Sequence, residues 1–432
     1  MENIKEEYTA RAVLAGLNSP RLPKEENADD WSLDELAALT ETAGGVAVAR
    51  VLQNREAPDA RTFIGDGKVR EIKELVENEA ATMVIFDNDL SPAQTRVLTE
   101  ELGVQVLDRS GLILDIFAQR ARTKEGRLQV ELAQYQYLLP RLTGMWTHLV
   151  RQNAAGGKSP IGTRGPGETQ LETDRRHIHR KIDKLRGDLE EVRRVRATQR
   201  DRRDKNEIPV VAIIGYTNAG KSTLLNALTG SDIPANDRLF DTLDTTSRLL
   251  TVSDTLDVVI SDTVGFIRKL PHQLIDAFKA TLEELQYADL MLHVIDASDE
   301  KWEAEAEVVD ELVRKIGAEK TPCIRVFNKS DKAFSKERPF GKDVVAISAK
   351  TGEGLDALLK KIDEQLDKGA RRVTIHLPYG SGAVLDELYR DAKVESVDYG
   401  DTIDIVAVCT PKVMGHIGQF IEDYVPPKED WE

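Results

Sequence analysis

Residues 215–222 read Gly-Tyr-Thr-Asn-Ala-Gly-Lys-Ser, which fits the pattern G-x-x-x-x-G-K-[ST] of a phosphate-binding loop. The apolar run Val210–Ile214 precedes the loop, and Ser222–Leu228 after it has helical spacing. A strand, a glycine loop and a helix in this order are the context in which the pattern is specific. Glycines let backbone N–H groups close on phosphate oxygens, and the helix N-terminus adds a favourable dipole. The stretch therefore predicts a P-loop nucleotide-binding domain.

Two side chains of this loop are expected to carry most of its chemistry. The Lys221 ammonium can reach the β- and γ-phosphates of a bound nucleotide, and the Ser222 hydroxyl can coordinate Mg²⁺. Lys221 is also a candidate to stabilise the transition state. The predicted phosphate-binding residues are Gly215, Tyr216, Thr217, Asn218, Ala219, Gly220, Lys221, Ser222 and Thr223.

Three further motifs follow the ends of predicted strands. Residues 262–265 read Asp-Thr-Val-Gly, where the carboxylate suits a water-mediated Mg²⁺ ligand and the N–H of Gly265 suits a γ-phosphate sensor. Residues 328–331 read Asn-Lys-Ser-Asp, and the Asp331 carboxylate can accept N1–H and N2–H₂ of guanine, a pair that adenine does not offer. Residues 348–350 read Ser-Ala-Lys and are expected to complete the base pocket.

Four motifs in this order, each after a strand, predict a GTPase domain with GTP as its substrate. Their expected nucleotide-contacting residues, beyond the phosphate-binding loop, are Asp262, Thr263, Val264, Gly265, Asn328, Lys329, Ser330, Asp331, Ser348, Ala349 and Lys350. Mg²⁺ is the expected cofactor, held by Ser222, Asp262 and one threonine hydroxyl. The residues alone leave open which threonine this is, because Thr242, Thr245 and Thr246 all lie in the right interval.

Two positions depart from the commonest GTPase pattern. Phe266 follows Gly265, where many GTPases place a glutamine that orients the attacking water. An apolar side chain cannot orient water, so unassisted hydrolysis is expected to be slow, and a merely packed Phe266 is compatible with this. Asn218 resembles the residue with which potassium-using GTPases hold a monovalent cation, so K⁺ is a further candidate cofactor and Asn218 a candidate in transition-state stabilisation. The alternative is an ordinary asparagine in a tight turn.

Before this domain, residues 45–108 alternate between strand and helix patterns, which predicts a small α/β unit with parallel pairing. The predicted strands are Val46–Gln53, Thr82–Asp87 and Val104–Leu107, and the predicted helices are Lys68–Asn78 and Ser91–Leu102. Ser91 is expected to cap the second helix, with a proline at its first position. The run Gly65–Lys68 is better interpreted as a turn and helix start than as a second nucleotide site.

Two apolar seams with helical spacing come next, and facing each other they predict an antiparallel helical hairpin. The seam residues are Leu128, Leu132, Tyr135, Leu139, Leu142 and Trp146, then Leu171, Ile178, Ile182, Leu185, Leu189 and Val192, and Tyr137 is also expected in the core. Asn153–Glu168 holds five glycines and two prolines, which predicts a tip loop with little regular structure. Outward positions of the second helix are basic, among them Arg175, Arg176, Arg180, Arg193, Arg194 and Arg196.

The predicted elements of the GTPase domain and of the tail complete the chain. Further strands are expected at Arg248–Ser253 and Leu256–Ser261 (a hairpin), Leu290–Asp296, Cys323–Asn328 and Val344–Ser348, with a last helix at Leu355–Leu366. In the tail, strands are expected at Val373–Leu377 and Thr402–Cys409, with a helix at Gly382–Asp391.

A chain of 432 residues exceeds what one hydrophobic core usually organises. The patterns predict a multidomain α/β protein. Its parts are an N-terminal α/β subdomain (1–125), a basic antiparallel helical hairpin (126–206), a P-loop GTPase domain with a mixed sheet flanked by helices (207–368) and a small α+β C-terminal domain (369–432).

Charge and composition limit the partners. The net charge is −16, yet residues 141–205 hold 17 basic and 9 acidic residues, a local charge of +8, so one acidic protein carries one basic arm. Apolar runs fall far short of the ~20 residues of a membrane helix. The two cysteines, Cys323 and Cys409, exclude a disulfide framework and have no metal-ligand spacing. A cytoplasmic monomer with no membrane or DNA partner is expected.

The chain resembles the HflX family of GTPases over most of its length. The resemblance lies in the runs Thr62–Lys68 (TFIGDGK), Asp108–Phe117 (DRSGLILDIF), Leu128–Tyr135 (LQVELAQY), Gly162–Glu172 (GTRGPGETQLE) and Phe240–Asp244 (FDTLD). The last run resembles the family's first switch segment. It adds Phe240, Asp241, Thr242, Leu243 and Asp244 to the expected nucleotide-contacting residues and favours Thr242 as the Mg²⁺ ligand.

The resemblance implies a protein that binds the large ribosomal subunit and, with GTP, dissociates stalled or idle 70S ribosomes under stress. It also implies that the hairpin loop approaches the peptidyl-transferase region. A basic hairpin with a glycine tip independently suits phosphate-rich rRNA. Two alternatives stay open: a GTPase of ribosome maturation or RNA modification, and, for the arm alone, a solvated coiled coil with surface arginines.

Overall fold

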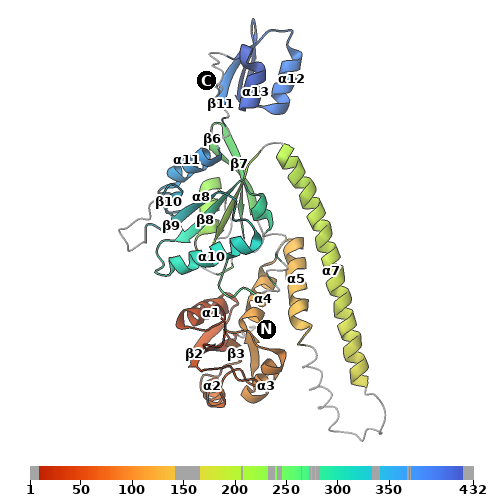
Figure 1. Ribbon diagram of the computed structural model, residues 1–432, viewed down its shortest axis with the longest axis vertical. Helices are drawn as coiled ribbons and strands as arrows, with labels where there is room; N and C mark the ends of the chain where they lie inside the picture. The colour runs from red at the N-terminus through yellow and green to blue at the C-terminus, as the bar shows by residue number, and fades with distance from the viewer. Residues whose placement is uncertain are drawn as a thin grey trace, which may run out of the picture.

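The structure, a computed structural model, describes residues 9–141, 166–205, 208–231, 239–240, 246–263, 265–271, 274, 278, 283–332, 341–366, 369 and 371–421. Its strands form three sheets arranged along the long axis of the molecule (Figure 1). The four-stranded sheet lies at one end, the six-stranded sheet in the middle and the three-stranded sheet at the other end. The multidomain α/β class predicted from the sequence is confirmed.

The four-stranded sheet has the order β2-β1-β3-β4, and all its strand pairs are parallel. Its elements are β1 (Arg11–Asn18), α1 (Asp30–Thr42), β2 (Val46–Asn54), α2 (Asp66–Asn78), β3 (Met83–Phe86), α3 (Pro92–Leu102) and β4 (Gln105–Asp108). The elements predicted after residue 45 and their parallel pairing are confirmed. Ser91 caps α3, and Gly65 precedes the first turn of α2, so this run is a helix start.

Strand β1 and helix α1 were not predicted. The six inner residues of β1 are all buried, because the strand lies between β2 and β3 with both faces covered. Such a strand shows no alternation of apolar and polar residues, and periodicity cannot distinguish it from other buried segments. Helix α1 did carry a signal, since Asp29 and Ser32 form a capping box at its start.

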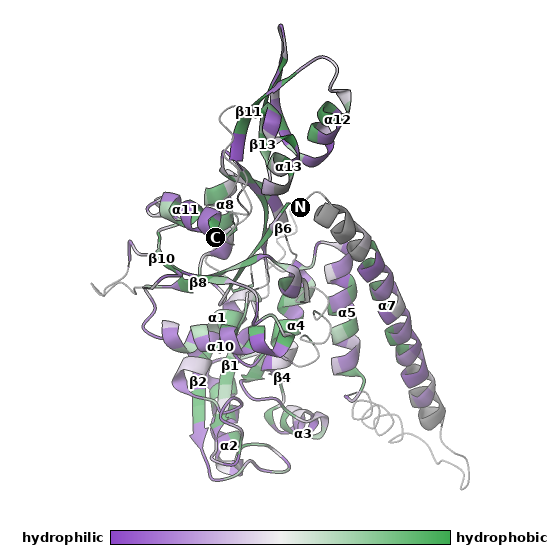
Figure 2. Cartoon of the chain, turned by 45° about the horizontal axis from the view of Figure 1, so that its top comes forward, coloured by the Kyte–Doolittle hydropathy of each residue, from purple (hydrophilic) through white to green (hydrophobic). Residues whose placement is uncertain are grey.

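The predicted hairpin is formed by α5 (Lys124–Leu138) and α7 (Pro166–Lys205), which run side by side (Figure 1). Its described core consists of Leu132, Ile182, Leu185 and Leu189, surrounded by Leu128, Tyr135, Leu139 and Ile178. The seam is thereby confirmed from Leu128 to Leu139 and from Ile178 to Leu189, whereas Val192 is half-buried and is not part of this cluster. Leu142, Trp146 and the side chain of Leu171 lie outside the described residues. Figure 2 shows α7 as largely hydrophilic apart from this stripe.

Two details of the hairpin prediction were wrong. Pro166–Glu168 belongs to α7 rather than to the tip loop, because proline suits the first turn of a helix; the rest of the predicted loop, 153–165, lies outside the described residues. Tyr137 does not join the seam that contains Tyr135. Two residues apart on a helix, the two side chains point to different faces, and Tyr137 contacts Asp108 before helix α4 (Arg109–Arg120).

The six-stranded sheet has the order β10-β9-β8-β5-β7-β6, with β6 antiparallel to β7 and the other pairs parallel. Its strands are β5 (Val210–Gly215), β6 (Thr246–Ser253), β7 (Leu256–Asp262), β8 (Leu290–Asp296), β9 (Cys323–Asn328) and β10 (Val344–Ala346). Around it are α8 (Lys221–Thr229), η1 (Glu283–Tyr287), α10 (Trp302–Ile316) and α11 (Leu355–Leu366). The predicted mixed sheet is confirmed, with β10 ending two residues early.

The third sheet, β11-β13-β12, is antiparallel and covered by two helices. Its elements are β11 (Arg371–Leu377), α12 (Gly382–Asp391), β12 (Lys393–Tyr399), β13 (Ile403–Cys409), α13 (Pro411–Ile417) and η2 (Gly418–Phe420). Strand β12 was not predicted, because it is a largely exposed edge strand rich in polar residues. Within the described ranges, every helix is too short or too polar to span a bilayer.

Candidate nucleotide-binding site

The phosphate-binding loop lies between β5 and α8, as its sequence predicts. Two glycines are required by close approach. A Cβ on Gly215 would lie 2.3 Å from the Val294 carbonyl oxygen, and one on Gly220 would lie 2.2 Å from Nδ2 of Asn328. Gly220 also has a φ of +94°, which favours glycine. The loop is therefore packed tightly against strands β8 and β9.

Lys221 is held against the backbone of this loop. Its Nζ donates to the carbonyl oxygens of Gly215 (3.1 Å) and Tyr216 (2.7 Å), and the side chain is buried. Burial lowers the pKa of the ammonium to about 8, an effect that the nearby Asp262 carboxylate partly offsets. A Cβ on Gly265 would lie 3.1 Å from this Nζ. The predicted γ-phosphate sensor and the predicted phosphate-binding lysine are thus neighbours.

Two of the three expected magnesium ligands are in contact. The Ser222 hydroxyl donates to Oδ2 of Asp262 at 2.7 Å. Both groups offer hard oxygen donors of the kind Mg²⁺ prefers, and they come from adjacent elements, the start of α8 and the end of β7. The pair fits a magnesium ion that uses few protein ligands. Thr242 and Thr245 lie outside the described residues, as do Asp241, Leu243, Asp244 and Val264.

The base-pocket motifs are joined by the side chain of Asn328. Its Nδ2 donates to the Ala219 carbonyl (2.9 Å), and its Oδ1 accepts from the backbone N–H of Ala349 (2.9 Å). This one amide links the phosphate loop to the loop after β10. The Ser348 hydroxyl donates to Oδ1 of Asp331 at 2.7 Å and lowers the pKa of that carboxyl. The expected guanine acceptor is therefore ionised and oriented.

Other predicted residues occupy supporting places around this pocket. Lys329 forms an ion pair with Asp296 at 2.7 Å, and the Ser330 N–H donates to the Ile347 carbonyl. Thr263 donates its hydroxyl to the Ile213 carbonyl. Lys350 is exposed. Asp296 was missed by the sequence reasoning, although an acidic residue at the end of a buried strand was a usable signal.

Phe266 packs into an apolar cluster, and its backbone lies beside the phosphate loop. Its N–H donates to the Gly215 carbonyl and its own carbonyl accepts from Thr217 N–H at 2.7 Å. The ring is 1% exposed and belongs to the largest hydrophobic cluster. Such a buried ring cannot orient water. Asn218 is exposed with a φ of +62°, a conformation that asparagine tolerates in turns.

Residues of the N-terminal domain reach the same loop, a contact that sequence reasoning did not predict. The Tyr216 hydroxyl contacts the Glu35 carboxylate of α1, and the Arg268 N–H donates to that hydroxyl at 3.0 Å. Arg109 and Asp87 complete the network. No short motif joins these residues, which lie up to 239 positions apart in ion pairs such as Asp29–Arg268.

Comparison with known proteins identifies the family. Residues 30–118 match the family described as GTP-binding GTPase N-terminal, 120–203 the GTP-binding GTPase middle region, 210–329 the 50S ribosome-binding GTPase family and 334–407 the HflX C-terminal domain. GTPase HflX of Caldanaerobacter subterraneus is 44% identical over 98% of this chain and 96% of its own. The chain belongs to the HflX family. It is a GTP hydrolase.

A second HflX relative agrees with this assignment. GTPase HflX of Escherichia coli K12 is 44% identical over 85% of this chain and 86% of its own length. Among solved structures, a GTP-binding protein from Sulfolobus solfataricus in complex with GDP shows 26% identity, covers 83% of this chain and 98% of its own, and has a TM-score of 0.43.

The base pocket yields the first prediction. Replacing Asp331→Asn should weaken GTP binding about a hundredfold and improve binding of xanthosine triphosphate, because an amide cannot accept both guanine N–H groups. Competition binding with the two nucleotides measures this. Asp254→Asn is the matched control, the same change at an exposed position of the turn between β6 and β7. Unchanged GTP affinity in the Asp331 variant would contradict the assignment.

The lowered pKa of Lys221 yields the second prediction. A base with a depressed pKa loses its charge as the pH rises through that value, about 8 here, whereas bound phosphates should keep it charged. GTP binding at pH 8 should therefore take up about half a proton, and the Kd should rise about fivefold from pH 8 to 9. Calorimetry in two buffers of different ionisation enthalpy measures the uptake. Binding without proton uptake at pH 8.5 would contradict the prediction.

Proposed function

We propose that this protein binds the large ribosomal subunit and uses GTP binding and hydrolysis to dissociate stalled or idle 70S ribosomes under stress. The observation that carries the proposal is the basic hairpin, a two-helix arm joined to a GTPase site in one chain. Helix α7 has 40 residues, so it spans about 60 Å. Such an arm can reach far beyond the GTPase domain.

The charges on α7 support an RNA partner. Arg175, Arg180 and Arg193 are exposed and are not part of the hairpin seam. Other arginines form exposed pairs within the helix, Arg176 with Glu172 and Arg194 with Glu191, and pairs of this kind contribute little to stability. Their charge remains available to phosphates, which release condensed cations when bound. A solvated coiled coil has no need of this excess charge on one chain segment.

In the GTPase site, each residue has a proposed part. Lys221 contacts the β- and γ-phosphates, and Asp331 and Asn328 select guanine. Ser222, Asp262 and Thr242 hold Mg²⁺, which supplies charge neutralisation at the phosphates when bound. The N–H of Gly265 senses the γ-phosphate. Because Phe266 is buried and apolar, the free protein hydrolyses GTP slowly, and the large subunit stimulates the reaction.

The rival, a GTPase of ribosome maturation or RNA modification, predicts a partner enzyme or a catalytic cysteine. Burial raises the pKa of the Cys323 thiol to about 11, and it does the same for Cys409. Neither thiol is activated as a nucleophile, since nucleophilic cysteines have lowered pKa values.

The proposed function is tested by sedimentation of 70S ribosomes with this protein and a non-hydrolysable GTP analogue. The proposal requires that the ribosomes separate into their subunits.

The third prediction concerns the arm. Replacing Arg193→Ser together with Arg194→Ser should weaken large-subunit binding and reduce its salt dependence, because each lost phosphate contact lowers the slope of log K against log salt by about one. The matched control is Arg70→Ser with Lys73→Ser, an equal charge change on exposed positions of α2.

Shortening 153–165 to a few glycines should leave GTP affinity intact and abolish ribosome splitting. Parental splitting by that deletion would refute the arm's role.

The fourth prediction concerns potassium. We propose that Asn218 helps to hold K⁺ near the phosphates, so exchanging Na⁺ for K⁺ should raise the GTP hydrolysis rate of the parent. Asn218→Gly should lose this effect and keep the loop conformation, because glycine adopts a positive φ freely. Asn218→Ala removes the side chain but strains the loop, which separates the two contributions. Equal rates of the parent in both salts would leave Asn218 as a turn residue.

A further inference from the structure

Helix α4 lies where three parts of the molecule meet: the four-stranded sheet, the hairpin helix α5 and the GTPase domain (Figure 1). We refer to Gly265–Lys269, after β7, as switch II, and to the segment that contains Phe240 as switch I. Residues at both ends of α4 contact these switches. The residue that caps α4 contacts the hairpin.

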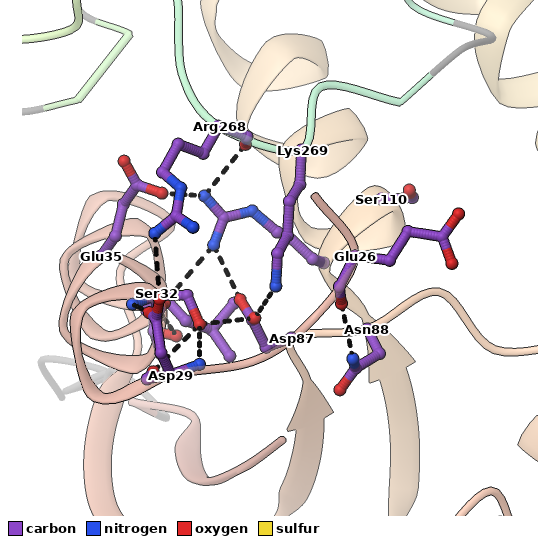
Figure 3. A network of polar contacts seen from close by, with 12 residues as sticks. Glu26, Asp29, Ser32, Glu35, Asp87, Asn88, Ser110, Arg268 and Lys269 are labelled. Carbon is purple, nitrogen blue, oxygen red and sulfur yellow. Dashed lines mark hydrogen bonds and ion pairs between the residues drawn. The ribbon is translucent and has the colours of Figure 1, made fainter. Parts of the chain in front are cut away.

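At the first turn of α4, the Arg109 guanidinium holds switch II. Its Nη2 donates to the Arg268 carbonyl at 3.2 Å and pairs with Glu35, and its Nη1 contacts Asp87 at 2.8 Å. The side chain is fully buried, and these carboxylates raise the pKa of Arg109 above its ordinary value, so it stays charged. Lys269 contacts the other oxygen of Asp87 (Figure 3). Switch II is thereby tied to the N-terminal sheet by its backbone and by a side chain.

Near the last turn of α4, the Phe117 ring contacts Phe240 of switch I and Phe278, which follows switch II in the chain. Its centroid is 4.6 Å from that of Phe240 and 5.5 Å from that of Phe278, and both pairs are edge-to-face. All three rings are buried in the cluster that also contains Phe266. A displacement of α4 would therefore disturb the ring contact with switch I and the apolar cluster that contains Phe266 of switch II.

The backbone of the switches depends on these contacts. Phe240 has a φ of +56° and Lys269 a φ of +55°, a region that residues other than glycine rarely adopt. Strained conformations persist where the surroundings hold them. In each case the side chain is held by the N-terminal domain, Phe240 by Phe117 and Lys269 by Asp87. Releasing the contact allows each switch to relax.

Residues of the hairpin form hydrogen bonds with Asp108, the residue that caps α4. Asp108 is buried, and its Oδ1 accepts from the Gly111 N–H (2.8 Å) and from the Tyr137 hydroxyl of α5 (2.7 Å). Its Oδ2 accepts from Arg141 at 2.7 Å, and that guanidinium stacks on the Tyr137 ring at 3.5 Å. The next residue in the chain is Arg109. The anchor of the hairpin and the anchor of switch II are thus consecutive residues.

We propose that helix α4 couples the hairpin to both switches, with Asp108, Arg109 and Phe117 as positioning residues. A change of nucleotide that moves switch II at Gly265 must move or break the Arg109 and Lys269 contacts, which displaces α4 and, through Asp108, α5. Coupling of this kind is reciprocal, so docking of the hairpin alters the switches by the same free energy. The inference deepens the proposed function, and the part that concerns the ribosome rests on that function.

The decisive experiment needs no ribosome. Hydrogen exchange of the full chain is compared between GDP and a non-hydrolysable GTP analogue. In the parent, exchange should differ between the two nucleotides in both α4 and α5. In the double variant Tyr137→Phe, Arg141→Gln, the difference should persist in α4 and disappear in α5. Tyr135→Phe is the matched control: two residues away on α5, its hydroxyl contacts Lys181 across the hairpin instead of α4.

Two results would overturn the proposal. One is a parent whose α4 exchanges alike with both nucleotides; the other is a nucleotide-dependent difference in α5 that survives the double variant. A second variant, Phe117→Leu, keeps the core apolar and has no bond to the hairpin. It should reduce the nucleotide dependence of exchange in both helices, and unchanged exchange there would also contradict the coupling.

A second experiment uses large ribosomal subunits. They should stimulate GTP hydrolysis by the parent and by Tyr135→Phe, and stimulation of the double variant should fall about fivefold or more, within the usual range of allosteric coupling. Free-protein GTP affinity should stay within about twofold. Full stimulation of the double variant contradicts the coupling. A parent that no subunit stimulates refutes the proposed function instead, and hydrogen exchange alone then decides on α4.

Discussion

A buried guanidinium joins the N-terminal α/β subdomain to the GTPase domain. Arg109 is 1% exposed, and a charge removed from water is costly unless acceptors surround it. Its acceptors come from three distant segments: Glu35 of α1, Asp87 after β3 and the carbonyl of Arg268 in switch II. All three must therefore be in place together. The apolar cluster around Phe117 follows the same boundary and buries the rest of the interface.

The proposed nucleotide site is formed by strand ends instead of by a buried charge. Its residues stand at the ends of β5, β7, β9 and β10, and the parallel strands of this part of the sheet bring their carboxyl ends to one edge. Asn328 then links the phosphate loop to the loop after β10. Tyr216 links the Arg109 network to the nucleotide site, because its backbone belongs to the phosphate loop and its hydroxyl contacts Glu35. The N-terminal domain therefore contacts the loop that we propose binds the phosphates of the substrate.

Much of this could be predicted from local patterns. The phosphate loop, the Asn328–Asp331 motif and the hairpin seam each depend on spacing within a short segment, so periodicity and motif order were sufficient. Strand β1 was missed because a central strand buried on both faces has no alternation, and β12 because an exposed edge strand carries few apolar residues. Tyr137 was assigned to the wrong face because helical spacing gives a stripe but does not say which neighbour each residue meets.

The sequence by itself determined the family and the GTPase chemistry, and it is the basis of the proposed nucleotide site, since these depend on residue types at fixed offsets along the chain. Only the tertiary structure decided that Arg109 joins Asp87 and Glu35 to the backbone of switch II, and that the Phe117 ring contacts Phe240 and Phe278. The physical reason is that buried charges and aromatic rings find partners by proximity after folding. No local pattern records a contact between residues more than a hundred positions apart.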